Sequence, residues 1–410
     1  MKVAVIGGGA SGMVASIMLK KNGHDVYLFE KNNMLGKKLL ITGKGRCNLT
    51  NNTSGPEFLQ NVVRGAKFFQ SAEHNFNSAD TIKFFEDLGV KTKVERGGRV
   101  FPETEKAKDV RDALQNALKN LKVNVNLNTQ VEDVLIENNK ICGIIVNGEK
   151  LNFDAVIVAT GGKSYPQTGS SGDGFVFAKH AGHLVEELKP ALNGVEISGN
   201  ECKTLEGLSL KNVCICAKNK GKVEFKSEIG EMLFTDVGIS GPLVLTMSSF
   251  VNRKDIDEVC INFKPALSTA QIKDKIDRII TQTPTKTLSS LLASMLPKRL
   301  VQVFAKRLGA QLTLKINQLK RDDRENLVKL LSEFSLKFKR VEPIETSVIT
   351  SGGVSLREIN PKDMQSKIIK GLFFIGEVLD VDALTGGFNL QIAFSSAASC
   401  ANSNYFKGEK

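Results

Sequence analysis

Lys2-Val-Ala-Val-Ile6 runs directly into Gly7-Gly-Gly9-Ala-Ser-Gly12, and this stretch decides the fold. The apolar run predicts a buried strand, and the apolar period from Ser11 to Asn22 predicts a helix. A second strand is expected at Asp25–Glu30. A Gly-x-Gly-x-x-Gly sequence between a strand and a helix is typical of a Rossmann βαβ unit that binds a dinucleotide. The alternative is a glycine-rich turn in an unrelated α/β domain.

The glycines and the end of the second strand suit a pyrophosphate and a ribose. Gly7 permits a tight turn, Gly9 lets the backbone approach the ligand, and Gly12 lets the helix pack closely on the sheet. The pyrophosphate is expected at the helix N-terminus, where free N–H groups favour negative charge. Glu30, 18 residues after Gly12, would accept hydrogen bonds from ribose hydroxyls and would disfavour a 2′-phosphate.

The composition is that of an ordinary globular protein. The chain has 410 residues, of which 41% are hydrophobic and 24% are charged, enough for two or three domains. Its seven cysteines are scattered and include no CxxC pair, which favours a reducing compartment. No apolar run approaches the roughly 18 residues of a membrane-spanning helix. We therefore expect a cytoplasmic protein that does not enter a membrane, and we expect no metal site.

The positive charge is concentrated in one part of the chain. Of the net charge of +12, residues 261–340 contribute 17 Lys/Arg against 6 Asp/Glu, a balance of +11. One interpretation is a solvated helical face. The other is a surface for an acidic partner such as nucleic acid or an anionic substrate. The stretch has no aromatic residues interleaved for base stacking, which weighs against nucleic acid.

The pattern of elements predicts a cofactor domain in two pieces. After Pro190 the sequence changes to alternating strand patterns followed by basic helical segments, and a glycine-rich, strand-forming style returns from Thr346. We therefore expect a cofactor domain built from residues 1–190 and 341–410. Residues 191–340 are expected to form an insert domain with its own core.

Two later segments resemble further signatures of FAD-binding proteins. Ala155-Val-Ile-Val-Ala-Thr160-Gly161-Gly162 is similar to the second signature, a strand that returns to the cofactor with glycines at its tip. Gly371-Leu-Phe-Phe-Ile-Gly376-Glu377 is similar to the third, in which a carboxylate meets the ribityl hydroxyls. Gly386 and Gly387 then precede a predicted helix at Asn389–Cys400. Its first N–H groups would stabilise negative charge on a reduced flavin, and a side chain at Gly387 would occupy cofactor space.

Three more segments, Gly36–Asn48, Gly98–Pro102 and Thr350–Val354, extend the resemblance over nearly the whole chain. The chain is similar to bacterial NAD(P)/FAD-dependent oxidoreductases, a family that includes aminoacetone-oxidase-like and bile-acid-reductase-like flavoproteins. The resemblance implies an α/β fold. It consists of a glutathione-reductase-type FAD-binding Rossmann domain in two segments, with an inserted β-barrel plus helical domain.

The resemblance also implies which residues meet FAD. The basic loop from Lys37 to Arg46 would run along the pyrophosphate and flavin, with simple surface charge as the alternative. Val131 would touch the adenine or only pack in its strand, and Asp173 lies in a flavin loop or a plain turn. The candidate cofactor-binding residues are Gly7, Gly9, Ala10, Ser11, Gly12, Glu30, Lys31, Lys37, Lys38, Thr42, Gly43, Arg46, Val131, Thr160, Gly161, Asp173, Gly376, Glu377, Asp380, Gly387, Asn389 and Leu390.

These expectations predict a flavin oxidoreductase that exchanges a hydride between FAD and a small organic substrate, with NAD(P)H as a possible electron donor. The alternatives are an oxidase that uses oxygen and an RNA- or partner-binding flavoprotein with a basic insert. Cys47 stands alone after the first motif, so dithiol relay chemistry is not expected there. Catalytic residues are not identified. Arg99 is a candidate for binding a substrate carboxylate or carbonyl, with a surface ion pair as the alternative.

Overall fold

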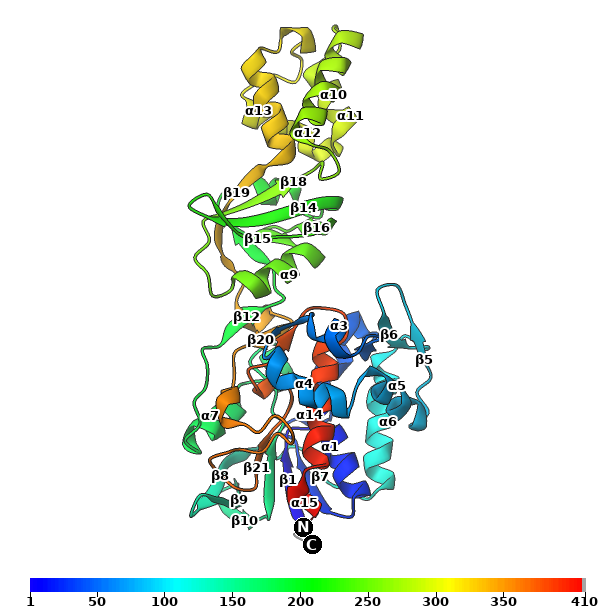
Figure 1. Cartoon of the computed structure of the whole chain (residues 1–410), viewed down its shortest axis with the longest axis vertical. Coiled ribbons are helices and arrows are strands. Elements are labelled where there is room, and N and C mark those ends of the chain that lie inside the picture. The colour runs from blue at the N-terminus through cyan, green and yellow to red at the C-terminus, as the bar shows by residue number, and fades with distance from the viewer. Residues whose placement is uncertain (408–410) are drawn as a thin grey trace. The chain divides into compact units, whose positions relative to one another are not determined.

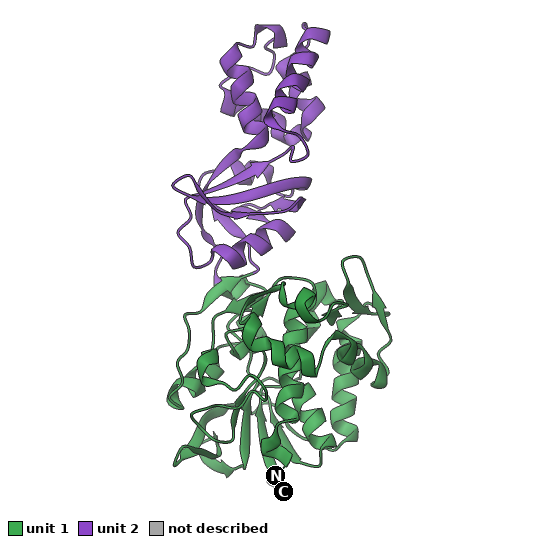
Figure 2. Ribbon diagram, viewed as in Figure 1, with its two compact units in different colours: residues 1–191, 344–410 green, residues 192–343 purple. Residues whose placement is uncertain are grey.

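The computed structural model describes residues 1–407, which form two compact units (Figures 1 and 2). Within the described residues, unit 1 comprises 1–191 and 344–407, and unit 2 comprises 192–343. The chain thus leaves unit 1 after Ala191 and returns to it at Ile344. Each unit has its own buried apolar core.

Unit 1 is built on a five-stranded sheet with the order β21-β11-β1-β2-β7, in which all neighbouring strands are parallel. β21 comes from the C-terminal segment and pairs with β11, so the sheet is completed only after the chain has passed through unit 2. The expected Rossmann-type α/β fold is confirmed. The strands are β1 (Lys2–Ile6), β2 (Asp25–Phe29), β7 (Asn124–Asn126), β11 (Ala155–Val158) and β21 (Leu372–Phe374).

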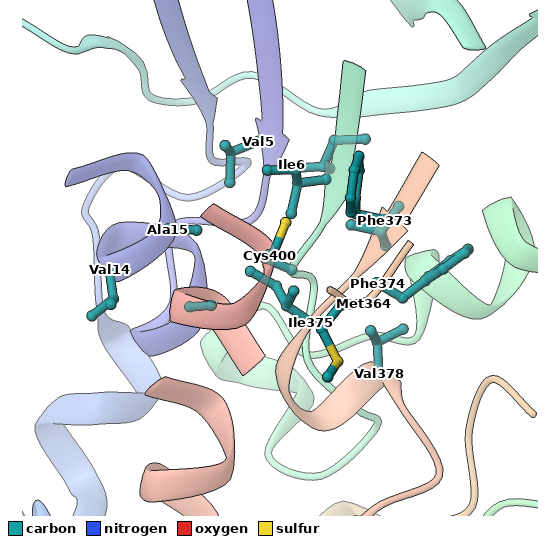
Figure 3. Packing of buried hydrophobic residues seen from close by; sticks show 14 of the residues in the cluster. Val5, Ile6, Val14, Ala15, Met364, Phe373, Phe374, Ile375, Val378 and Cys400 are labelled. Atoms are coloured by element: carbon teal, nitrogen blue, oxygen red, sulfur yellow. The ribbon is translucent and has the colours of Figure 1, made fainter. Parts of the chain in front are cut away.

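Helices α1 (Ala10–Lys21) and α14 (Phe388–Ala401) pack against each other beside this sheet, and α6 (Ala107–Asn120) packs on α1 (Figure 1). α14 carries the run Ser395-Ser-Ala-Ala-Ser399, all of it buried. Small side chains let the two helices approach closely. In Figure 3, Cys400 of α14, Ile6 of β1 and Phe373 of β21 belong to one buried cluster.

Smaller elements of unit 1 surround the sheet. An antiparallel meander formed by β8 (Val131–Glu137), β9 (Lys140–Val146) and β10 (Glu149–Asn152) is a separate sheet that contacts β11. The other strands are β3 (Thr50–Asn51), β4 (Val62–Arg64), β5 (Thr92–Val94), β6 (Arg99–Pro102), β12 (Lys189–Ala191), β20 (Ile349–Ser351) and β22 (Asp382–Ala383). The other helices are α2 (Lys37–Ile41), α3 (Gly55–Leu59), α4 (Ala66–Asn75), α5 (Ser78–Asp87), α7 (Asp173–His180) and α15 (Asn404–Lys407).

Unit 2 contains an antiparallel β-barrel. Its strands pair in the order β14-β16-β17-β13-β19-β18, and a further pairing between β14 and β18 closes the ring. The β-barrel expected in the insert is therefore observed. The elements are β13 (Val195–Ile197), α8 (Glu201–Leu205), β14 (Ser209–Asn219), β15 (Lys222–Lys226), β16 (Gly230–Phe234), β17 (Gly238–Ser240), α9 (Pro242–Val251), β18 (Glu258–Asn262) and β19 (Phe334–Val341).

A helical lobe is inserted between β18 and β19 and contains the basic stretch. Ser268 caps α10, where Ile272, Ile276 and Ile280 recur every four residues and are buried. This period leaves the charged residues on the opposite, solvated face. The helices of the lobe are α10 (Thr269–Gln282), α11 (Leu288–Met295), α12 (Lys298–Leu308) and α13 (Arg321–Ser332). Within residues 1–407, none of the helices combines the length and apolar character that crossing a membrane requires.

The position of β21 gives a test of the two-segment fold. Phe373 is fully buried and its ring lies 5.1 Å from that of Phe406, so Phe373→Ala should lower the free energy of unfolding of unit 1 by about 3–5 kcal/mol. Urea denaturation, monitored through the release of bound flavin, measures this change in the free energy of unfolding. Val176→Ala, at a side chain that is 49% exposed, should change the midpoint little. Equal effects would mean that β21 is not part of the core.

Candidate functional site

The glycine motif brings the N-terminus of α1 to the end of β1. At Gly7 (φ +107°) an added Cβ would lie 2.5 Å from the carbonyl oxygen of Ala159, and at Gly12 it would lie 1.9 Å from that of Gly7. Both positions therefore require glycine. Gly9, the N-cap of α1, instead faces open space, with no atom within 4 Å of an added Cβ. The first N–H groups of α1 thus point toward a cradle that suits a pyrophosphate.

Glu30 stands at the end of β2 beside this cradle and is almost fully buried. Its Oε2 accepts the Gly8 N–H at 2.8 Å, while Oε1 accepts the backbone N–H of Asn32 at 2.8 Å and its side-chain amide at 2.7 Å. These bonds fix the carboxylate in one orientation. Since two carboxylate oxygens offer about four acceptor positions, capacity remains for a ribose hydroxyl.

Two lysines of the candidate set lie around this end of the site. Lys31 forms an ion pair with Asp173 at the start of α7, with 2.7 Å between Nζ and Oδ2. Lys37 Nζ donates to the Asn32 side-chain oxygen at 2.9 Å. Asp173 is therefore an ion-pair partner on a helix N-terminus, where a carboxylate is stabilised.

Lys38 connects the basic loop to the third motif. Its Nζ lies 2.6 Å from both Glu377 Oε2 and Ser164 Oγ. The other Glu377 oxygen accepts the Thr350 N–H at 2.9 Å. The Lys38 and Glu377 side chains are each 22% exposed. Four segments that are far apart in the sequence thus present one partly buried charged cluster.

The ends of β11 and β21 meet the same edge of the sheet as α1. At Gly376 (φ +74°) an added Cβ would lie 2.7 Å from Ser11 Oγ, so the tip after β21 sits against the first turn of α1. Thr160 follows β11, and Gly161 has a left-handed backbone with φ +74°. Among the described residues, the buried Thr160 hydroxyl has no hydrogen-bond partner. Ala10 precedes Ser11 at the start of α1 and is half-buried.

The loop from Thr42 to Asn48 has an unusual backbone, with positive φ at Gly43, Lys44 and Cys47. Thr42 Oγ1 donates to the Leu39 carbonyl at 2.6 Å. Burial raises the pKa of the Cys47 thiol to about 12, which disfavours a reactive thiolate. The buried Asn48 Oδ1 has no hydrogen-bond partner within residues 1–407.

Arg46 is held by protein partners. Its guanidinium lies over the Phe101 ring, 4.1 Å from the centroid, and forms ion pairs with Glu95 at 2.5 Å and Glu105 at 3.1 Å. The bonds to these carboxylates raise the pKa of Arg46. The guanidinium therefore fixes the loop against β6. Arg99, at the start of β6, is exposed and donates from Nε to the Arg96 carbonyl at 3.1 Å.

The segment from Asp380 to Leu390 forms hydrogen bonds within itself and with β4. Asp380 accepts two hydrogen bonds from Arg64, at 2.9 and 2.6 Å. The Asn389 side chain accepts the Ala383 N–H and donates to the Ala383 carbonyl, which closes the loop before α14. Leu390 is half-buried against the core. Asp380 and Asn389 thus have structural partners of their own.

Gly387 is the N-cap of α14, with φ +101°. An added Cβ would lie 2.3 Å from the Thr50 carbonyl oxygen. The Thr50 backbone thus already excludes a side chain at Gly387, and the contact of Gly387 with the cofactor stays a prediction. Val131 at the start of β8 is 4% exposed and lies in the apolar core of unit 1.

Sequence reasoning missed the residues that connect the Gly387 turn to the basic loop. Thr50 Oγ1 donates to Gln391 Oε1 at 2.6 Å. The buried Asn51 amide donates to the Gly97 carbonyl at 3.0 Å and to the Gly386 carbonyl at 3.1 Å. Thr50 and Asn51 directly follow the Gly36–Asn48 segment, and this position in the sequence is the one signal that could have identified them.

These observations fit FAD. The open cradle at Gly9, the carboxylate of Glu30 and the unpartnered Thr160 oxygen lie where β1, β2 and β11 end, and the basic loop adds the unpartnered Asn48 oxygen. They offer N–H donors for phosphates and oxygen acceptors for hydroxyl or ring N–H groups. When bound, FAD would supply hydride transfer.

Comparison with known proteins identifies the family. Residues 1–403 match the model of the HI0933-like protein Rossmann domain, and the chain belongs to this family. The expected relationship to bile-acid-reductase-like flavoproteins is confirmed, and the chain is an FAD-dependent oxidoreductase.

Three similar proteins span nearly the whole chain. A 3-dehydro-bile acid delta(4,6)-reductase of Clostridium scindens is 29% identical, covering 96% of this chain and 97% of its own. A ribosomal RNA dihydrouridine synthase of Escherichia coli is 30% identical, covering 97% and 96%. The structure of 3-ketosteroid-delta4-(5alpha)-dehydrogenase from Rhodococcus jostii shares the fold, with a TM-score of 0.51 at 14% identity over 98% and 97% of the two chains.

Glu30→Gln should weaken FAD binding. Replacing the carboxylate by an amide removes the charge on each hydrogen bond that it accepts, and each lost charge-assisted bond costs about 1.5–3 kcal/mol. Titration of the apoprotein with FAD measures the change in Kd. Glu137→Gln, at an exposed residue of β8, serves as the control. If both variants have the same Kd for FAD, Glu30 ends β2 but does not contribute to FAD binding.

Gly387→Ala should impair folding of the loop and FAD retention, because its Cβ would collide with the Thr50 backbone. Gly89→Ala is the matched control, since Gly89 also has a positive φ (+87°) but faces open space. The control isolates the cost of the left-handed backbone, about 1 kcal/mol or more. The FAD content of the two purified variants distinguishes the effect of the collision with Thr50 from the effect of the left-handed backbone alone. Full retention by Gly387→Ala would contradict the geometry.

Proposed function

We propose that this protein uses FAD to reduce a carbon–carbon double bond conjugated to a carbonyl group in a small organic substrate, with NAD(P)H as the electron donor. The names of the two full-length relatives support this chemistry. A delta(4,6)-reductase acts on double bonds of a 3-dehydro compound, and dihydrouridine is uridine with two added hydrogens. Both relatives are matched over nearly the whole chain, so the matched regions include both the Rossmann unit and the insert.

The observation that carries the proposal is the convergence of segments at the carboxyl edge of the five-stranded sheet. Gly9 opens the cradle at α1, Lys38 and Glu377 face each other, and Gly387 caps α14. A pyrophosphate at α1 would fix the cofactor. The N–H groups at the start of α14 would stabilise negative charge on a reduced flavin. This arrangement favours accepting a hydride from one partner and passing it to another.

Arg99 is the proposed substrate-positioning residue. It is exposed at the start of β6, its register partner is Asn51, and the Asn51 amide bonds to the Gly386 carbonyl. Through this contact β6 is connected to the turn before α14. A guanidinium at that place would donate hydrogen bonds to the carbonyl of an unsaturated ketone and draw electron density from its double bond.

The test is anaerobic reduction of the holoprotein by NADH and by NADPH, followed at the flavin absorbance band. We expect one of the two nucleotides to bleach the flavin rapidly, and an α,β-unsaturated ketone such as a 3-oxo-4-ene steroid to restore the colour. Bleaching by neither nucleotide would overturn the NAD(P)H linkage. Reoxidation by oxygen alone, with no effect of the enone, would favour an oxidase.

Arg99→Ala should leave the FAD content unchanged and lower kcat/KM for the enone by about 10- to 100-fold, which corresponds to one charge-assisted hydrogen bond. Arg96→Ala is the control, because Arg96 is an exposed arginine three residues away. Steady-state kinetics of both variants measure the difference. If both variants lose kcat/KM equally, Arg99 contributes only to the general surface charge and does not position the substrate.

A second candidate function is reduction of uridine in RNA. The similarity to the ribosomal RNA dihydrouridine synthase and the balance of +11 over residues 261–340 favour it. A basic surface of this kind attracts a phosphate backbone and loses affinity as salt rises. A salt-dependent gel shift with ribosomal RNA, together with flavin reoxidation by RNA in place of the enone, would select this candidate.

A further inference from the structure

Two cysteines that are 44 positions apart in the sequence meet on the barrel of unit 2. Cys216 of β14 and Cys260 of β18 are register partners in the antiparallel pairing that closes the ring, and both are free thiols. Partner residues of an antiparallel ladder have side chains on the same face and Cα atoms about 4.5 or 5.5 Å apart. Both separations lie within the range of about 4.4–6.8 Å found for disulfides.

The two thiols lie on the outer face of the barrel. On β14 the neighbours of Cys216, Ile215 and Ala217, are buried in the core of unit 2. The alternation of side chains along a strand therefore turns Cys216 outward, where it is half-buried. Cys260 is 2% exposed. Cys216 is thus the thiol that a reagent in solution reaches first, and Cys260 is its partner on the adjacent strand.

The surroundings favour a thiolate on Cys216. The Cys260 side chain interacts with it across the strand pair, and Lys218 lies two residues along the same face of β14. Lys218 also forms an ion pair with Glu333, whose Oε1 is 3.9 Å from the Cys260 sulfur. The interaction with the Cys260 side chain and the charge of Lys218 lower the pKa of Cys216 against the opposing effect of burial. The thiolate is the form that attacks disulfides.

We propose that Cys216 and Cys260 form a redox-responsive dithiol, a modification site whose co-reactant is a low-molecular-weight disulfide. The Cys216 thiolate attacks one sulfur of that disulfide, forms a mixed disulfide and releases one small thiolate. Cys260 then loses its proton and attacks the Cys216 sulfur, forming the Cys216–Cys260 bond and releasing the second small thiolate. The protein loses two electrons and two protons, and the small disulfide is reduced to two thiols.

The bond would join the barrel at the pairing that closes it. β14 and β18 stand at the two ends of the six-strand order given above. Their pairing turns an open sheet into a ring. Glu333, the residue after α13 that contacts both Lys218 and Cys260, lies where the helical lobe returns to the barrel. The oxidised form would therefore resist unfolding of unit 2 more than the reduced form.

The experiment uses the FAD-loaded full-length protein treated with oxidised glutathione. We expect loss of two of the seven free thiols, a protein lighter by two hydrogen atoms, and one cross-linked peptide pair that contains Cys216 and Cys260. Peptide mapping by mass spectrometry without reductant identifies the pair. Dithiothreitol should restore both thiols, and the thermal unfolding temperature of unit 2 should rise on oxidation.

Three variants separate the dithiol from general thiol reactivity. Cys260→Ser should stop at a glutathione adduct on Cys216, and Cys216→Ser should prevent the rapid loss of thiols. Cys214→Ser, on the same strand with Asn262 as its register partner, should behave like the wild type. A stable glutathione adduct on wild-type Cys216, or a cross-link through Cys214, would overturn the proposal. The wild-type peptide map decides the question if a variant fails to fold.

Discussion

The close approach of α1 to the sheet is the constraint on which unit 1 depends. The carbonyl oxygen of Gly7 occupies the place of a side chain at Gly12, and the Ala159 carbonyl occupies that of a side chain at Gly7. These contacts aim the first turn of α1 at the edge where Glu30, Thr160 and the other loops converge. One added methyl at either glycine would move the helix, and the cradle at Gly9 would lose its shape.

Local sequence determines much of this fold, because the strands and helices that form the dinucleotide unit are consecutive in the chain. The ends of α1, β2 and α14 fall within one or two residues of expectation. The partners of charged side chains were not predictable in the same way. Arg46 faces Glu95 and Glu105, and Asp380 faces Arg64, 316 residues away. Such pairs are formed by tertiary structure, and neither spacing nor residue type indicates them.

The same limit applies to residues that bind their own backbone. The Asn389 amide closes the turn at Ala383, and the Thr50 backbone excludes a side chain at Gly387. A glycine or asparagine before a helix predicts a turn from local chemistry alone. Whether the turn packs against protein or against a ligand depends on other segments, such as Thr50–Asn51. The periodicity of the sequence does not indicate which segments these are.

The place where the helical lobe joins the barrel has an evolutionary consequence. The lobe leaves after β18 and returns at β19, and these strands are hydrogen-bonded neighbours, so its two ends are held about one strand spacing, roughly 4.8 Å, apart. A segment whose ends are that close can lengthen, shrink or be exchanged without moving either strand. The lobe is therefore the part of the chain in which descendants can change surface chemistry most freely while the barrel and the Rossmann sheet stay as they are.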